Sequence, residues 1–500
     1  MSVHTDEILS FEQYFQREAA PAKIGVFCVG LHTYWPQFDG LLQRLMGYHA
    51  RLCGMLRQRG LEIVDAGMSD TPAKACAIGE RLRAENVDLL ICNVVTYSPA
   101  ACTLPVVQRT GRPVVLAALQ PDAALNYQRA TTFMQLCNDN ITSVPEICCA
   151  IRRAGRDIAD VVVGLLRADD SAINVLADWG RIARCLHVLR NGRLGLMGHV
   201  YEGMLDMNSD PTMVEGHFGA HVEHIELDDL QVRVDAVTDA EVDRRVLQIR
   251  EIFHFPPPGS DPLAGEVDPA ELRWSARVSI GLEQLIGDFR LDGLAYYYRG
   301  LAGNANERLA CSLIVGASLL TGRGVPIAGE LDLKNCLAML IMDRLGAGGS
   351  FAELHPIDFT GDFVLVGHDG PHHVAIADGR PVLRGLSLLH GKRGRGPSVE
   401  FAIRHGPVTL LGLTQTFDGR FRFVVAEGES LPGPIPATGN TNTRCRFAPD
   451  VRTFLRRWSL AGPTHHFALG VGHQAAVLRK LAGALGVECV DVTAVQNDAP

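Results

Sequence analysis

The chain has 500 residues, of which 47% are hydrophobic and 21% charged, and its formal net charge is -9. This composition indicates a globular chain with more than one core, and it offers no basic surface for nucleic acid or for an anionic membrane. Because the N-terminus lacks the order of a secretory signal and no apolar run could cross a bilayer, we expect a cytoplasmic protein without nucleic acid or membrane partners.

The N-terminal part of the chain alternates strand-like and helix-like segments. An apolar, β-branched run at Lys23–Val29 predicts a strand, and helical spacing over 40–60 predicts the helix that follows it. Further strands are expected at 61–67, 87–95 and 112–119, with helices at 73–86 and from about 100. This alternation predicts a Rossmann-like, doubly wound α/β domain over residues 1–190.

A second α/β domain is expected over residues 191–349. It begins with a strand-like segment at 192–200 and continues through helical patterns at 238–253, 271–289 and 307–324, interrupted by the proline-rich stretch 254–272. We therefore predict two Rossmann-like doubly wound α/β domains in succession.

After about residue 349 the sequence changes to alternating strands. Asp-Gly pairs at 369–370, 378–379 and 418–419 are typical of tight antiparallel hairpins. We expect a β-rich, barrel-like C-terminal domain over residues 350–500. Within it, the segment 390–398 ("HGKRGRGPS") could hold a phosphate, although a solvated hairpin loop is the favoured interpretation.

The thirteen cysteines are isolated or form the pair Cys148-Cys149, without CxxC spacing. Such usage favours neither zinc ribbons nor a disulfide framework. We therefore expect buried, reduced thiols.

Residues of the kinds that bind metals lie in four glycine-containing segments. These are "PIAGELDLKN" with Glu330 and Asp332, "GAGGSFAELHPIDF" with Glu353, "FVLVGHDGPHH" with His368, and "AGPTHHFALGVGH" with His465 and His466. Two carboxylates and two imidazoles can form a mixed oxygen and nitrogen site for manganese, cobalt or iron that leaves positions for substrate oxygens. Each such residue alone is more often packed or solvated, so only the joint pattern favours a metal site.

In this order, the four segments resemble the L-arabinose isomerase and L-fucose isomerase superfamily, and most closely the arabinose isomerases. The family's "GEGDWK", "SFMED", "LGSH" and "GGAHH" correspond to "GELDLK", "SFAEL", "LVGH" and "GPTHH" in this chain. The segment "VVTYSPA" also resembles the family's "LHTFSPA", so the resemblance covers most of the chain. By motif position, it implies that the metal ligands are Glu330, Glu353, His368 and His466.

The resemblance implies a metal-dependent aldose-ketose isomerase that uses Mn2+, or another divalent cation such as Co2+ or Mg2+, and assembles as a trimer or hexamer. The cation would stabilise an enediolate, and Glu330 and Glu353 would serve as acid and base in an order that the sequence leaves open. Asp332 is expected to orient the site beside the substrate, and His465 to support it or to be structural. The remaining histidines of these segments lack a family match and are expected to be structural; they are His355, His372, His373 and His473.

The sugar pocket departs from the family pattern. The family's "GSQHLYG" corresponds to "GLHTYWP", which makes His32 and Trp35 candidate substrate-binding residues, and a histidine-glycine segment is replaced by residues 138–146 ("NDNITSVPE"). The sugar therefore stays open among L-arabinose, another pentose, a deoxyhexose and a modified sugar. Two alternatives are a non-catalytic sugar-binding relative and a metal-dependent sugar epimerase or lyase on the same scaffold.

Overall fold

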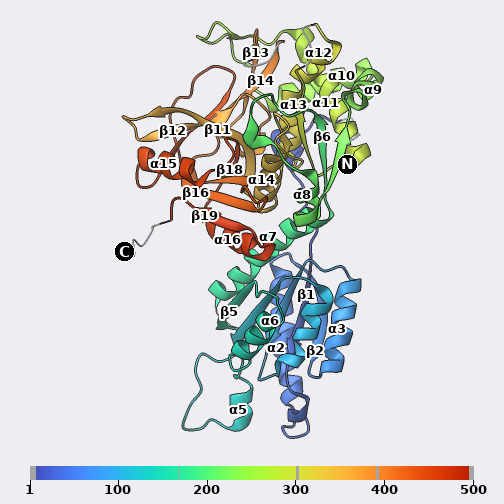
Figure 1. Ribbon diagram of the computed structural model, residues 1–500, viewed down its shortest axis with the longest axis vertical. Helices are drawn as coiled ribbons and strands as arrows, with labels where there is room; N and C mark the ends of the chain where they lie inside the picture. Colours follow the sequence, from blue (N-terminus) through green and yellow to red (C-terminus); the bar gives the residue numbers. More distant parts are fainter. Residues whose placement is uncertain (1–6, 168, 300–302, 390–393, 495–500) are drawn as a thin grey trace. The chain divides into compact units, whose positions relative to one another are not determined.

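The computed structural model describes residues 7–167, 169–299, 303–389 and 394–494, and it divides into two compact units (Figure 1). One unit comprises residues 20–187, and the other comprises 1–19 together with 188–500. Within the described ranges, no helix combines the length and the apolar character needed to span a membrane.

The unit 20–187 is built on a parallel sheet with the order β2-β1-β3-β4-β5. Its strands are β1 (Lys23–Val29), β2 (Glu62–Ser69), β3 (Leu89–Val94), β4 (Val114–Gln120) and β5 (Asp160–Leu165). Its helices are η1 (His32–Tyr34), α2 (Leu41–Gln58), α3 (Pro72–Ala84), η2 (Ala100–Cys102), α4 (Leu104–Thr110), α5 (Thr132–Leu136), α6 (Val144–Arg153) and the start of α7 (Asp170–Asn191). Phe27 and Cys28 enter different cores because successive side chains of a strand face opposite sides. The sheet is therefore doubly wound, as predicted.

The second unit contains a smaller parallel sheet with the order β10-β9-β6-β7. Its strands are β6 (Arg193–Gly198), β7 (His221–Ile225), β9 (Gly293–Tyr297) and β10 (Ile327–Ala328). The associated helices are η3 (Leu205–Met207), α8 (Pro211–Phe218), α9 (Leu227–Ala236), α10 (Asp239–Ile252), α11 (Pro269–Phe289), α12 (Ala305–Cys311), α13 (Leu313–Gly322) and α14 (Leu333–Arg344). The single helix predicted over 307–324 is wrong: α12 ends and α13 begins at Ser312, whose hydroxyl donates to the carbonyl of Arg308 at 2.9 Å.

The C-terminal strands close into a barrel. The order β15-β18-β11-β12-β17-β16 is completed by the pairing of β15 with β16, and β19 adds to β16 in parallel. These strands are β11 (Gly348–Asp358), β12 (Phe363–His368), β15 (Gly406–Gln415), β16 (Phe421–Leu431), β17 (Thr441–Phe447), β18 (Phe467–Val471) and β19 (Glu488–Asp491). The remaining elements of the unit are α1 (Phe11–Phe15), β8 (Ala264–Gly265), η4 (Val374–Ile376), β13 (Val382–Leu386), β14 (Gly396–Glu400), α15 (Val451–Ala461) and α16 (Ala475–Leu485). The predicted class, parallel α/β sheets followed by a β-rich barrel, is confirmed.

Only one of the three Asp-Gly pairs forms the predicted hairpin. Residues 418–419 connect β15 and β16, whereas 369–370 and 378–379 precede η4 and β13 without joining paired strands. The two other aspartates instead face histidines: Asp369 lies 3.0 Å from His368 and Asp378 lies 3.0 Å from His405. In the segment 390–398, residues 390–393 lie outside the described residues, and Gly396 begins β14.

Helix α14 lies between the smaller parallel sheet and the barrel. It contacts β9 and β10 on one side and β11, β15 and β18 on the other, and Leu333 to Asp343 are all buried (Figure 1). Because α14 has no face toward solvent over these residues, its first turn is enclosed within the unit.

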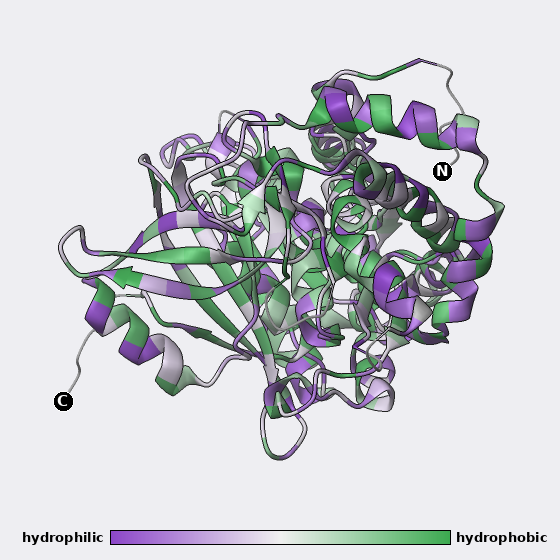
Figure 2. Ribbon diagram, turned by 90° about the horizontal axis from the view of Figure 1, so that it is seen from above, coloured by the Kyte–Doolittle hydropathy of each residue, from purple (hydrophilic) through white to green (hydrophobic). Residues whose placement is uncertain are grey.

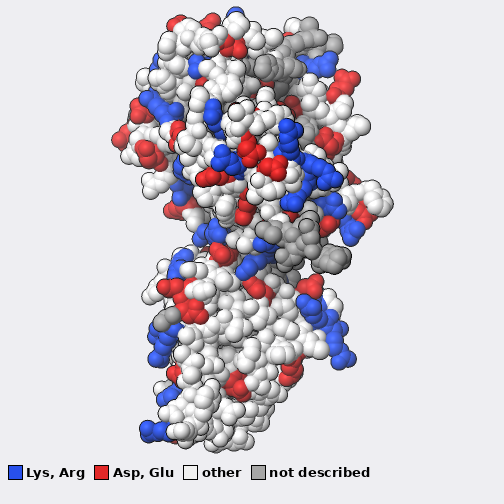
Figure 3. Space-filling view, turned by 90° about the vertical axis from the view of Figure 1, so that its left-hand side faces the viewer, with Lys and Arg blue, Asp and Glu red and all other residues white. Residues whose placement is uncertain are grey.

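The hydropathy of the ribbon matches this arrangement. Figure 2 shows long hydrophobic stretches along the barrel strands and alternating hydrophobic and hydrophilic residues along helices at the periphery. On the face shown in Figure 3, acidic and basic side chains are interspersed.

Candidate metal centre

The turn that precedes α14 carries two of the predicted site residues, Glu330 and Asp332. Glu330 and Leu331 both have left-handed backbones, with φ of 58° and 60°. Asp332 follows as the N-cap of α14 and accepts a hydrogen bond from the backbone N–H of Asn335 at 2.9 Å. Non-glycine residues in this conformation are strained and occur often at functional sites. The turn projects Glu330 away from the helix that Asp332 begins.

The barrel register brings the other three residues together. Glu353 on β11 pairs with Gly367, the neighbour of His368 at the end of β12. On the other side of β11, Ala352 pairs with Phe467, the neighbour of His466. Three segments that are distant in the sequence therefore meet at one place on the barrel.

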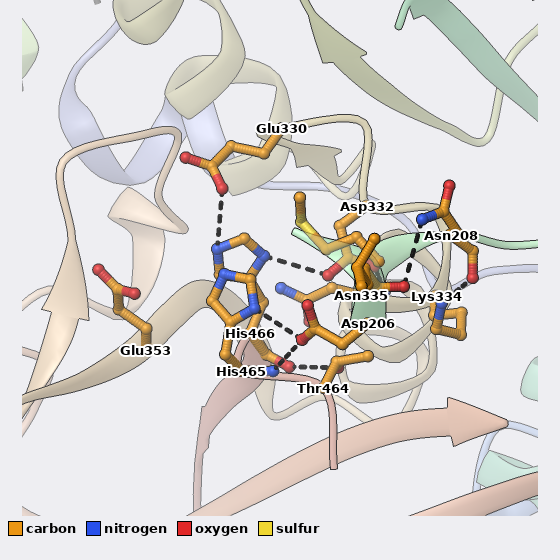
Figure 4. A network of polar contacts seen from close by, with 12 residues as sticks. Asp206, Asn208, Glu330, Asp332, Lys334, Asn335, Glu353, Thr464, His465 and His466 are labelled. Atoms are coloured by element: carbon orange, nitrogen blue, oxygen red, sulfur yellow. Dashed lines mark hydrogen bonds and ion pairs between the residues drawn. The ribbon is translucent and has the colours of Figure 1, made fainter. Parts of the chain in front are cut away.

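The donor atoms of the four predicted ligands lie in two groups that share His466. His466 Nε2 lies 3.4 Å from Glu330 Oε2, and His368 Nε2 lies 3.8 Å from Glu353 Oε1. Donor atoms of Glu353, His368 and His466 all lie within 4.8 Å of one another. Figure 4 shows Glu330 and Glu353 on the Nε2 side of the His466 ring.

Two of these donor atoms are buried without a hydrogen bond. Among the described residues, neither Glu330 Oε2 nor His466 Nε2 has a hydrogen-bond partner. Buried polar atoms without a hydrogen bond are costly and call for an explanation such as an ion. Two carboxylates and two imidazoles form a donor set suited to a divalent cation such as Mn2+, so the residues fit a metal.

Carboxylates lie beside the opposite nitrogens of both imidazoles. Asp332 Oδ2 lies 3.1 Å from His466 Nδ1, and Asp369 Oδ1 lies 3.0 Å from His368 Nδ1. At His466, where the contact is a hydrogen bond, the carboxylate fixes the tautomer, because a proton on Nδ1 leaves the lone pair of Nε2 for a cation. Figure 4 shows Asp332 on the side of His466 opposite to Glu330.

The electrostatics of the cluster favour positive charge at its centre. Burial lowers the pKa of His466, which keeps this imidazole neutral at neutral pH. Burial alone would raise the pKa of Glu353, but the hydrogen bond from His355 and the charge of His368 hold it below its ordinary value. Burial would lower the pKa of His368, but Asp369 and the glutamates raise it instead. The carboxylates that favour a proton on His368 would equally favour a divalent cation beside it.

Sequence reasoning missed two residues at the site. His355, expected to be structural, places Nε2 3.3 Å from Glu353 Oε1, and its other ring nitrogen faces Asn442. Asp369 was interpreted only as a turn residue. The signals were local: His355 lies two residues beyond Glu353 on the same strand, where side chains share a face, and Asp369 adjoins His368.

The segment around η3, which is distant in the sequence, contacts residues next to the proposed ligands. Asp206 accepts from the backbone N–H of His465 at 2.8 Å and lies 2.7 Å from His465 Nδ1. The ammonium of Lys334, which is 1% exposed, donates to the carbonyl of Asn208 at 2.7 Å and contacts Ser209 Oγ at 3.0 Å. Burial lowers the pKa of Lys334. His465 also lies within ligand distance of Glu330 and His466, so it is a further candidate donor.

The other histidines of the four segments make contacts of their own. The backbone N–H of His372 donates to Ser318 Oγ at 3.1 Å, and His373 Nε2 lies 3.3 Å from Asp343. His473 Nε2 lies 3.2 Å from the carbonyl of Gly428. These contacts agree with structural roles.

The two predicted sugar-pocket residues belong to the unit 20–187, not to the unit that holds the metal cluster. His32 is exposed on η1, directly after β1, at the carboxyl edge where doubly wound sheets bind ligands. Trp35 is half-buried, and its indole Nε1 donates to Asp70 Oδ2 at 2.8 Å. In the divergent segment 138–146, Asn140 donates to the carbonyls of Val94 and Leu119 and so ties β3 to β4.

The fold and the cluster define an α/β protein with a carboxylate-imidazole centre between a parallel sheet and a closed β-barrel. The family model of the L-arabinose isomerase C-terminal domain matches residues 348–488, which include three of the four clustered residues. An L-arabinose isomerase from Nocardioides sp. is 28% identical over 80% of this chain and 79% of its own length. An L-arabinose isomerase from Acidothermus cellulolyticus is 26% identical over 65% of this chain and 64% of its own length. One from Cellvibrio japonicus is 23% identical over 93% of this chain and 92% of its own length. The chain is therefore similar to L-arabinose isomerases over most of its length, and its C-terminal part matches their C-terminal domain.

Proposed function

We propose that this chain is a metal-dependent aldose-ketose sugar isomerase. The observation that carries the proposal is the cluster of Glu353, His368 and His466, whose donor atoms lie within 4.8 Å of one another, with Glu330 Oε2 3.4 Å from His466 Nε2. Glu330 Oε2 and His466 Nε2 are buried and without hydrogen-bond partners among the described residues. The similarity to L-arabinose isomerases over most of the chain supports the same reaction class. The proposed ion is Mn2+, with Co2+ or Mg2+ as alternatives, because the donors are mixed oxygen and nitrogen.

The four residues would hold one divalent cation, which would polarise the sugar carbonyl as a Lewis acid and stabilise negative charge on the adjacent oxygens. Glu330 and Glu353 come from different elements, the turn before α14 and strand β11. They can therefore act on different parts of a substrate held between them. One carboxylate would take the proton from the carbon acid, and the other would carry a proton to or from the neighbouring oxygen.

The remaining contacts would keep this pair in place. Asp332 and Asp369 orient the two imidazoles through their Nδ1 atoms. His355 holds Glu353 and, together with His368, keeps its carboxylate ionised. Assembly into a homo-oligomer stays a prediction, which light scattering would test. Binding of the sugar beside His32 and Trp35 also stays a prediction, which substrate kinetics of His32→Ala would test.

The direct test measures proton exchange in D2O with metal-stripped protein, with and without Mn2+, over a panel of pentoses, deoxyhexoses and hexoses. The proposal expects Mn2+-dependent deuterium at C1 or C2 together with a ketose product. Exchange with an epimerised or cleaved product would replace the isomerase by an epimerase or lyase. The absence of exchange with every sugar of the panel would contradict catalysis of this kind.

Substitutions test the two proposed proton carriers. Glu330→Gln and Glu353→Gln should each abolish turnover while circular dichroism stays unchanged, because an amide cannot transfer the proton and binds the cation less strongly. Glu429→Gln is the matched control, since Glu429 is exposed on barrel strand β16. Full activity of either site variant would overturn the assignment.

A further inference from the structure

A second group of metal-binding residue types lies in the unit 20–187. His49 and Cys53 are four residues apart on α2 and therefore share one face of the helix. Asp65 on β2 faces them: its Oδ1 lies 2.9 Å from His49 Nε2, and Cys53 Sγ lies 3.8 Å from the same nitrogen. One donor atom from each of the three residues lies within 4.8 Å of the other two.

The geometry of this group differs from that of a nucleophilic relay. A relay uses one imidazole nitrogen for the nucleophile and the other for the carboxylate. Here both partners approach Nε2 of His49, while Nδ1 faces the side-chain amide of Asn93 at 3.5 Å. Burial, followed by the charge of Asp65, raises the pKa of Cys53 to about 12. The thiol is thus protonated and unreactive by itself, whereas three donors meeting at one point suit an ion.

A backbone irregularity sets the position of Asp65. Strand β2 pairs Asp65 with Val26 but Gly67 with Phe27, so one extra residue, Ala66, interrupts the parallel ladder. Gly67 has a φ of 74°, and its N–H donates to Asp65 Oδ1 at 3.0 Å. Bulges redirect side chains and are frequent next to functional sites. This bulge holds the Asp65 carboxylate beside His49.

We propose that His49 Nε2, Cys53 Sγ and a carboxylate oxygen of Asp65 bind a divalent cation of the zinc class. Tetrahedral zinc with ordinary bond lengths separates nitrogen from oxygen by about 3.4 Å and nitrogen from sulfur by about 3.6 Å. The observed separations of 2.9 and 3.8 Å lie close to these values. Three protein ligands leave the fourth position for water, as in open zinc sites.

A cation could reach the site from solvent on the side of Asp65. Each proton displaced by its binding has an acceptor. The Asp65 side chain is 37% exposed, while that of His49 is 1% exposed, so the ion would enter on the carboxylate side. The S–H bond of Cys53 breaks as the metal-sulfur bond forms, and its proton goes to solvent. The proton on His49 Nε2 moves to Nδ1, where the amide oxygen of Asn93 accepts it after a half-turn of that amide. The bound ion would fasten α2 to β2.

Cobalt provides a signal that separates this site from the centre at Glu330. Metal-stripped full-length protein is titrated with Co2+, and the near-ultraviolet thiolate-to-cobalt charge-transfer band is recorded. The four residues of the other centre include no thiol, so a band should report on Cys53. The expected result is a saturable band of one equivalent that is lost in Cys53→Ser and retained in Cys102→Ser, a buried thiol of the same unit. Glu330→Gln should keep the band, which separates this inference from the proposed function.

Asp65→Asn provides a second test with a less buried residue. It should weaken Co2+ binding at this site at least tenfold while circular dichroism stays unchanged, and Zn2+ should compete with Co2+ for the band. The proposal is overturned if wild type shows no thiolate band, if the band persists in Cys53→Ser, or if Asp65→Asn binds Co2+ as tightly as wild type.

Discussion

Replacing Asp332 by Asn tests how the fold prepares His466 as a ligand. One carboxylate oxygen of Asp332 caps α14 at Asn335, and the other holds His466 Nδ1 at 3.1 Å. Asparagine has the same shape but only one acceptor oxygen. If the asparagine oxygen still caps α14, the side-chain NH2 group faces His466 Nδ1. The imidazole proton must then move to Nε2. If the oxygen instead faces His466, α14 loses its N-cap bond.

The first orientation blocks the nitrogen that would bind the cation. Losing such a supporting carboxylate typically weakens metal affinity 10- to 100-fold, which is about 1.4 to 2.8 kcal/mol. The second orientation costs about 1 kcal/mol of stability through the lost cap. We therefore expect Asp332→Asn to bind Mn2+ at least tenfold more weakly than wild type, with at most a small fall in melting temperature.

The assay is a Mn2+ titration of metal-stripped protein, in which free Mn2+ is followed by electron paramagnetic resonance. Asp450→Asn is the matched control, because Asp450 caps α15 through Thr453 at 2.9 Å and contacts none of the four proposed ligands. An Asp332→Asn protein that binds Mn2+ like wild type would refute the role assigned to this contact.

Three further predictions concern stability. Burial would raise the pKa of Asp343, but His373 and Arg17 hold it well below its ordinary value, so its contribution is present above about pH 4 and is lost as the pH falls further. The melting temperature of Asp343→Asn should therefore fall less steeply than that of wild type as the pH is lowered below about 4. A fall as steep as that of wild type would contradict this. Trp35→Phe removes the hydrogen bond to the buried Asp70 and should cost about 1.5 kcal/mol, measured by urea unfolding; an unchanged midpoint would exclude the cost. Leu337→Ala creates a cavity in the fully buried α14 and should cost about 3 kcal/mol in the same assay, and a loss under 1 kcal/mol would mean that the helix repacks.

The periodicity of the sequence predicted the parallel sheets and the barrel because burial dictates it directly. Strand β1 lies at the predicted residues, and the doubly wound order follows from strands that alternate with helices. The Asp-Gly signal failed at 378–379, where Asp378 faces His405 from a segment distant in the sequence, and at 369–370, where Asp369 faces its neighbour His368. Local turn preference gives no information about a partner that is distant in the sequence.

The candidate ligands could be named from four motifs, but their convergence could not be derived from any one of them. It depends on the barrel register, which pairs Ala352 with Phe467 and Glu353 with Gly367. The group of His49, Cys53 and Asp65 carried no motif, since the spacing between α2 and β2 matches no metal signature. Its geometry depends on a bulge that alternation along a strand does not predict.

The strained turn at Glu330 explains why the first ligand depends on structure outside its motif. Two successive left-handed residues cost on the order of 1 to 3 kcal/mol each, so neighbouring contacts must hold them. The N–H of Leu331 donates to the carbonyl of Tyr296 on β9 at 3.0 Å, and the N–H of Asp332 donates to that of Gly329 at 3.0 Å. The buried α14 then fixes the direction of the chain beyond Asp332. These backbone hydrogen bonds and the buried helix together hold Glu330 beside His466, so the position of the first ligand depends on β9 and α14 as well as on its own motif.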